Sequence, residues 1–189
     1  MNAQQIVEAL KQKFGEAVTG TTEFRGEQTL HVKLESVKAL LKYCRDEMSF
    51  DYLVDISSLD HFETEPRFEM VYELYGYGHH QHLRVKSKVS EDESVPTISD
   101  IWPTANWHER EVYDMMGITF DGHPDLRRIL MWEGYPFYPL RKDFPLAGKP
   151  SEMPDVAFTG VAPLEGGPFV TSPGTCSTVE AEPRAKRFE

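Results

Sequence analysis

Cysteine is scarce in this sequence: only Cys44 and Cys176 occur among its 189 residues. An iron–sulfur cluster is normally held by four cysteine thiolates, and two cysteines form no disulfide framework. The chain alone is therefore not expected to carry a cluster. Apolar runs are also short, since none approaches the roughly 18 residues that a membrane-spanning helix needs. The first ten residues, MNAQQIVEAL, lack the basic and apolar regions of a secretory signal, so none is expected.

Basic residues are also few in comparison with acidic residues. Lysine and arginine total 20 against 31 aspartates and glutamates, which gives a net charge of −11. This charge opposes binding to a nucleic-acid backbone or an anionic membrane surface unless the bases cluster strongly, which they do not. Hydrophobic residues (40%) and charged residues (27%) are close to the averages for soluble globular proteins. The composition predicts a folded chain with no nucleic-acid partner and no membrane span.

The first two thirds of the chain show the periodicities of helices and strands. Apolar residues at helical spacing predict a helix over about 2–14 capped by Asn2, and a second one that begins at a Ser36 cap and carries a buried Cys44. A third helix is expected to start at a capping pair of Asn106 and Glu109 and to end at Gly117. Period-two alternation predicts four strands, the last two forming a hairpin, over residues 28–34, 52–59, 68–74 and 83–89. A short helical turn is expected around Ile101 and Trp102.

This order predicts an α+β fold in which helices pack on one face of a mixed sheet, followed by an extended C-terminal loop and tail. The α+β domain is expected to occupy residues 1–122. Residues 123–150 are rich in charge and aromatic rings without any regular period, and form a loop that packs on the domain and on partners. Residues 151–189 contain five prolines and four glycines and are expected to be an extended tail that other surfaces must order.

Charge is distributed unevenly between the third helix and the loop after it. Residues 91–114 hold seven acids and one base, whereas residues 121–150 hold four acids and five bases. Buried or half-buried ion pairs are therefore expected to tie the loop onto the helix. Within the helix, Arg110 and Asp114 are four residues apart and are expected to pair. The acidic stretch from Glu91 to Glu93 is expected to be a solvated loop.

Two groups of residues suggest chemistry. His79, His80 and His82 form a tract in which the last two would share one face of a strand, as two metal ligands would. The same histidines are more simply explained as solvated residues of a hairpin turn, and no carboxylate is placed by spacing to support metal ligands. Glu111 and Asp114 are a candidate carboxylate pair for acid–base work or metal binding, but are also typical of a helix whose acids meet nearby bases.

The most specific pattern is the run from Ala105 to Ile118, ANWHEREVYDMMGI, followed by GHPDLRRIL at 122–130 and YPLRKDFPL at 138–146. It resembles the 30-kDa subunit family, the C subunits of bacterial respiratory complex I, the proton-translocating NADH:quinone oxidoreductase. The resemblance covers residues 102–150 strongly and the N-terminal region in layout.

The resemblance implies a structural role in the quinone-reducing module of a translocase, without catalytic residues in this chain. It implies no cofactor or metal here, with FMN and Fe–S clusters in partner subunits. The expected partners are the B, D and I subunits, which form the quinone pocket, and the expected location is the cytoplasmic face of the bacterial plasma membrane. Motif residues expected to act in assembly are Glu109, Arg110, Glu111, Asp114, His123, Asp125, Arg127, Arg128, Arg141, Lys142 and Asp143.

Two alternatives to this role remain open at the level of sequence. The first is a homologous scaffold subunit of a membrane-bound hydrogenase or a ferredoxin-dependent complex, since such machines are similar in architecture. The second is a freestanding metal-dependent enzyme that uses the tract from His79 to His82.

Overall fold

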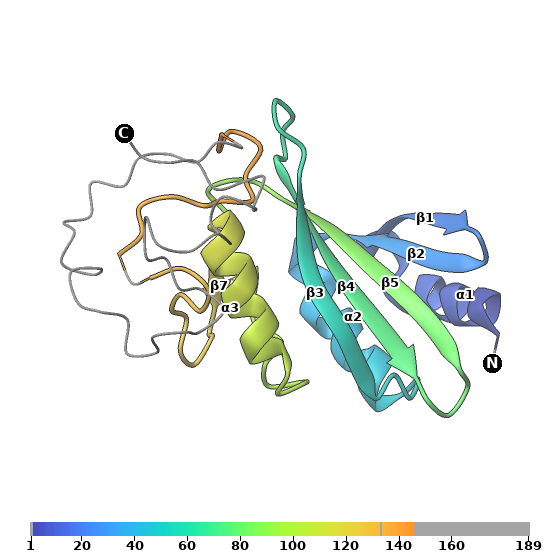
Figure 1. The fold of residues 1–189 in the computed structure, drawn as a ribbon. Helices are drawn as coiled ribbons and strands as arrows, with labels where there is room; N and C mark the ends of the chain where they lie inside the picture. The colour runs from blue at the N-terminus through green and yellow to red at the C-terminus, as the bar shows by residue number, and fades with distance from the viewer. Residues whose placement is uncertain (1, 133, 146–189) are drawn as a thin grey trace, which may run out of the picture. The chain divides into compact units, whose positions relative to one another are not determined.

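A computed structural model describes residues 2–132 and 134–145 (Figure 1). Its long elements are two N-terminal helices, a five-stranded sheet and a third helix after the sheet. In chain order the elements are α1 (Ala3–Phe14), a 3-10 turn (Gly15–Ala17), β1 (Val18–Phe24), β2 (Glu27–Val32), α2 (Leu34–Asp46), β3 (Tyr52–Asp60), β4 (Phe68–Gly76), β5 (Gln81–Val89), β6 (Val95–Pro96), α3 (Ala105–Met116) and β7 (Phe120–Asp121).

The sheet has the strand order β1-β2-β5-β4-β3 and is mixed, as the sequence predicts. Strands β2 and β5 run parallel, and the other three neighbouring pairs are antiparallel. The predicted hairpin is β4–β5, in register from Phe68 opposite Val89 to Gly76 opposite Gln81. A second, two-stranded sheet joins β6 and β7 in parallel.

Alternation along the strands separates a buried face of the sheet from a polar one. The buried face presents Leu30, Val85, Tyr72 and Ile56, and α1 and α2 pack against it with their apolar stripes. The opposite face carries charged side chains, among them Lys86, which pairs with Glu69 at 2.8 Å. Helix α3 packs against β3, and Figure 1 shows the two lying side by side.

Three local signals at the element ends are confirmed. The cap at Asn2 is present, because its side chain accepts from the N–H of Gln5 and the Gln5 side chain accepts from the N–H of Asn2. The turn before α3 is formed by bonds from the N–H groups of Ile101 and Trp102 to the carbonyl of Ile98. The helix stop at Gly117 adopts the left-handed conformation with φ of 76°.

Two expectations about element starts are wrong, and one strand was not expected. Helix α2 begins at Leu34, ahead of the expected Ser36 cap, because Leu34 already packs against the core as part of the first turn. Helix α3 begins at Ala105, so Asn106 lies inside it and forms no capping pair with Glu109. Strand β1 was not predicted, because its sequence VTGTTEF is rich in threonine, contains glycine and lacks apolar alternation.

The tail at 151–189 lies outside the described residues. Within the part of the chain that the structure describes, no helix is both long enough and apolar enough to cross a membrane.

Burial of Cys44 yields a chemical test of the core. Its side chain is fully inaccessible, and burial raises the pKa of the thiol well above its usual range. In a Cys176→Ser variant, where Cys44 is the remaining thiol, we expect reaction with a disulfide reagent to be about 100-fold slower or more in native buffer than in denaturant. Similar rates in the two conditions would show that Cys44 does not lie in the core.

Candidate functional site

In the segment from residue 123 to 145, the described residues (123–132 and 134–145) form no long helix or strand, yet polar contacts attach them to α3 and to the sheet. These contacts form three groups, each centred on one or two charged residues. The Asp114 group binds the middle of the segment, the Arg67–Arg141 group binds its end, and the Glu109 group binds its start.

In the Asp114 group, one buried carboxylate accepts four different donors. One of its oxygens, Oδ2, accepts from the backbone N–H groups of three consecutive residues, Ile129 (3.0 Å), Leu130 (2.6 Å) and Met131 (2.8 Å). The other, Oδ1, pairs with Nη1 of Arg128 at 2.6 Å. Burial favours a higher pKa for Asp114, but the backbone donors and the guanidinium outweigh it and hold the pKa below its usual range. Asp114 is therefore an anionic anchor for a turn of irregular backbone.

Arg128 extends this anchor to a later part of the segment. Besides the carboxylate, its guanidinium donates to the carbonyl of Asp114 at 2.9 Å and to that of Phe137 at 3.2 Å. It also lies over the rings of Tyr135 and Tyr138, at 5.7 and 5.1 Å from their centroids. One planar guanidinium thus joins α3 to two stretches of the segment, which an ammonium group could not do with the same geometry.

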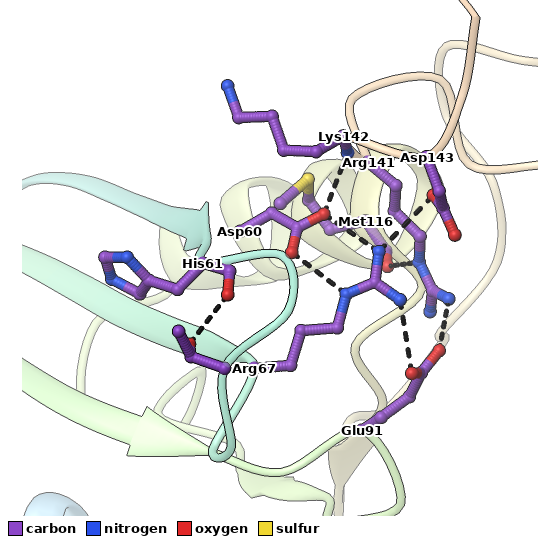
Figure 2. Close-up of polar contacts among 9 residues, drawn as sticks. Asp60, His61, Arg67, Glu91, Met116, Arg141, Lys142 and Asp143 are labelled. Carbon is purple, nitrogen blue, oxygen red and sulfur yellow. Dashed lines mark hydrogen bonds and ion pairs between the residues drawn. The ribbon is translucent and has the colours of Figure 1, made fainter.

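The Arg67–Arg141 group connects the sheet with the end of the segment (Figure 2). Asp60, the last residue of β3, receives Nε and Nη2 of Arg67 at 2.9 Å each and the backbone N–H of Lys142 at 2.8 Å. These donors, the guanidinium foremost, lower the pKa of Asp60. Arg67 also pairs with Glu91 at 3.2 Å and with Asp143 at 3.3 Å.

Arg141 completes this group at the C-terminus of α3. Its Nη1 pairs with Glu91 and its Nε donates to the carbonyl of Met116, each at 2.6 Å. A cation placed at the last carbonyls of a helix is favoured by the helix dipole. The position also explains Gly117: a Cβ there would lie 2.6 Å from Arg141 Nη2 and 2.7 Å from the Tyr138 ring, so only glycine leaves room for both.

The Glu109 group is buried beneath the start of the segment. The Glu109 carboxylate accepts from the hydroxyl of Thr97 at 2.6 Å and the N–H of Ile98 at 2.7 Å, and lies 3.9 Å from Nε2 of His123. Burial raises the pKa of Glu109, against the lowering effect of these donors. His123 accepts from the N–H of Asp125 through Nδ1 and contacts the carbonyl of Asn106 through Nε2, a pattern that fits one neutral tautomer.

Some of the predicted motif residues therefore contact one another in the structure. Asp114 pairs with Arg128, which confirms that an ion pair ties the loop to the helix. Glu109 and His123 also come together, as a carboxylate beside a neutral imidazole. Lys142 contributes its backbone N–H, and Arg141 and Asp143 their side chains, to a single group.

Other expectations for these residues are wrong. Arg110 does not pair with Asp114, because Arg128 and three N–H groups already occupy that carboxylate; it donates instead to the carbonyls of Arg127 and Arg128. Glu111 is exposed whereas Asp114 is fully buried, so the two do not form a carboxylate pair. Asp125 and Arg127, whose role in assembly stays a prediction, pair with each other at 2.9 Å on the surface.

Sequence reasoning missed Asp60 and Arg67, and assigned Glu91 to a solvated loop. Glu91 remains partly exposed, yet it bridges two arginines. No local spacing signals these partners: Asp60 and Lys142 are 82 residues apart in the chain.

The histidine tract does not converge on one point. The ring of His79 turns inward, contacts the carbonyl of Met48 at 3.0 Å and packs edge-on against Phe50. His80 and His82 both lie beside the ring of Tyr75. Among residues 2–132 and 134–145, no three His, Cys, Asp or Glu side chains are grouped as a metal ion would require.

Replacement of Asp114 tests the central anchor. In Asp114→Asn, the amide nitrogen cannot accept a hydrogen bond and Arg128 loses its buried counter-charge, so we expect roughly 3 kcal/mol lower stability in denaturant unfolding at pH 7. The native pKa of Asp114 lies below the unfolded value of about 3.9, so its contribution is present above that pH and is lost as the pH falls through the native pKa. The difference between the two proteins is expected to shrink in acid; a constant difference would contradict the assignment.

Comparison with known proteins agrees with this architecture. The family model for the respiratory-chain NADH dehydrogenase, 30 Kd subunit, matches residues 30–150. The C subunit of NADH-quinone oxidoreductase from Geotalea uraniireducens is 43% identical over 144 residues, which cover 76% of this chain and 88% of that protein. The protein of the same name from Geobacter metallireducens is 44% identical over 141 residues, covering 74% and 87%.

A solved structure shows the same fold. It is that of the membrane-bound sulfane sulfur reductase (MBS), an archaeal respiratory membrane complex, one chain of which aligns with a TM-score of 0.66 at 25% identity, over 76% of this chain and 85% of that one. The family match spans more than half of the sequence and includes the Asp114 group. The chain belongs to the 30-kDa subunit family of the respiratory-chain NADH dehydrogenase.

Proposed function

We propose that this chain is a structural subunit of complex I, the NADH:quinone oxidoreductase that couples electron transfer from NADH to quinone with proton translocation. Family membership supports the assembly. One observation supports the structural role. The least exposed charged side chains of the motif bind one another and backbone groups of the same chain. Electron transfer needs cofactors at fixed positions, so a rigid scaffold contributes to the mechanism by positioning its neighbours.

Three motif residues with little exposed side-chain surface act in assembly indirectly. Buried Asp114 and half-buried Arg128 and Arg141 hold the described residues between 123 and 145 in place, and these residues form the surface that a neighbouring subunit would meet. The exposed motif residues Glu111 and Arg127 are available for direct contacts. The proposed neighbours are the B, D and I subunits on the cytoplasmic face of the membrane, with FMN and Fe–S clusters carried by partner subunits and no catalytic residue in this chain.

A second assignment has one supporting observation. The likeness to a chain of the archaeal MBS complex supports a role as the homologous scaffold subunit of another kind of respiratory membrane complex. The candidates of that kind are a membrane-bound hydrogenase and a ferredoxin-dependent complex. Purification of the native complex through a tag on this chain distinguishes the two. Complex I predicts NADH-dependent quinone reduction by the purified material, whereas the alternative predicts its absence.

Arg128→Ala tests the scaffold role. The substitution leaves Asp114 as an unpaired buried charge and releases residues 128–137, so we expect the amount of assembled complex to fall about fivefold or more, because a small loss of stability changes abundance several-fold. Turnover per assembled complex is expected to stay unchanged. Arg45→Ala, the same change at an exposed arginine near the end of α2, is the matched control. Normal assembly with slow quinone reduction would contradict a positional role.

Removal of residues 151–189 tests the tail. Since the core formed by the described residues and the three polar groups precede the deleted part, we expect the shortened chain to unfold at the same denaturant midpoint as the full one. It is nevertheless expected to be absent from the purified complex. Co-purification of the shortened chain in normal amount would show that the tail is not needed for assembly.

A further inference from the structure

The two edges of the five-stranded sheet are not equivalent. Helix α3 packs against β3 at one edge. At the other edge, no helix or strand among the described residues lies beyond β1, as Figure 1 shows. An edge strand directs every second pair of backbone N–H and C=O groups away from its neighbour, so β1 presents a row of groups ready to pair with another strand.

Strand β1 carries few of the features that normally block such pairing. Natural edges are protected by lysine, by proline, by very short strands or by bulges. Over its seven residues, VTGTTEF, β1 contains neither lysine nor proline, and its irregularity is confined to the start, between Val18 and Gly20. The residues from Thr21 to Phe24 are all exposed and pair regularly with β2 on their other side.

A hollow of about 280 Å³ adjoins this edge on the polar face of the sheet. It is lined by Thr19, Gly20, His31, Val32, Lys86 and Lys88. Gly20 is the lining residue from the middle of β1, and its backbone lies close to the His31 ring, which a Cβ at this position would approach to 3.8 Å.

The lining of the hollow is locally basic, although the whole chain carries a net charge of −11. Lys86 and His31 already face the carboxylate of Glu69, at 2.8 and 3.8 Å, whereas Lys88 is exposed and makes no ion pair with any other described residue. Lys88 is therefore the cation that a carboxylate entering beside Gly20 would pair with.

We propose that β1 is extended by a strand of a partner polypeptide, and that an acidic side chain of this strand enters the hollow beside Gly20. Main-chain pairing supplies the affinity and the side-chain pocket supplies the selection, as in other cases of strand addition. The inference deepens the proposed function and rests on it, since the strand would belong to a neighbouring subunit of the same assembly. A second copy of this chain is disfavoured as the partner, because both copies would carry the same large negative charge.

Hydrogen exchange tests the pairing directly. Backbone amides of residues 18–24 are compared between the isolated full chain and the same chain in the purified complex. The amides that face away from β2 are expected to exchange rapidly in the isolated chain and about tenfold or more slowly in the complex. Absence of the chain from the complex would count against the proposed function. Its presence with unchanged exchange in β1 would overturn the strand addition alone.

Two neighbouring proline substitutions separate pairing from folding. Of Thr21→Pro and Thr22→Pro, one removes an N–H that bonds β2 and the other an N–H that faces outward, since successive groups alternate. The variant that keeps the native unfolding midpoint is the informative one. It is expected to enter the complex in at least fivefold smaller amount; normal incorporation would overturn the proposal.

Charge reversal tests the hollow. Lys88→Glu is expected to reduce incorporation into the complex about fivefold, whereas Lys13→Glu, the same change on α1, is expected to leave it unchanged. Equal effects of the two variants would overturn the assignment of an acidic side chain. Light scattering on the isolated chain tests whether the partner strand belongs to a second copy of this chain. If the isolated chain were a dimer whose β1 amides exchange slowly, the assignment to a different polypeptide would be overturned.

Discussion

The buried carboxylate of Asp114 is the contact on which the second half of the molecule depends. Residues 129–131 have no ladder partner, and backbone N–H groups that leave water must find an acceptor. Asp114 accepts from all three and pairs with Arg128 as well. The carboxylate thus replaces secondary structure as the organiser of this stretch, and the helix that carries it is itself held against β3.

The Arg67–Arg141 group links that arrangement to the sheet. Asp60 ends β3 and receives both a guanidinium and the backbone of Lys142, while Arg141 binds the last turn of α3. The Arg67–Arg141 group therefore contacts the sheet, α3 and the segment at once. A shift of any one of them would break contacts with the other two. Buried ion pairs add little net stability but penalise any other geometry strongly, because an unpaired buried charge is costly. This is the physical property that a positioning subunit requires.

Features that depend on interactions between residues close in the sequence were predicted correctly, whereas features that depend on distant residues were not. Helix α1 and the β4–β5 hairpin were predictable, because their apolar periodicity and caps are local. Strand β1 was not, because its only strong reason to be extended is β2 beside it. The expected pair of Arg110 and Asp114 failed although its spacing is ideal, since Arg128 and the backbone reach the carboxylate from outside the helix.

Composition, periodicity and motifs were enough to establish the α+β class, the mixed sheet with its helices, the lack of thiols for a cluster and the family to which the motif belongs. The sequence also indicated that an acidic helix and a basic loop neutralise each other. Tertiary structure alone decided which acid meets which base, that Glu109 and Asp114 are buried, and that one edge of the sheet stays open among the described residues. The reason is physical: periodicity and composition report local preference and burial, whereas partners as distant as Asp60 and Lys142 meet only when the whole chain is packed.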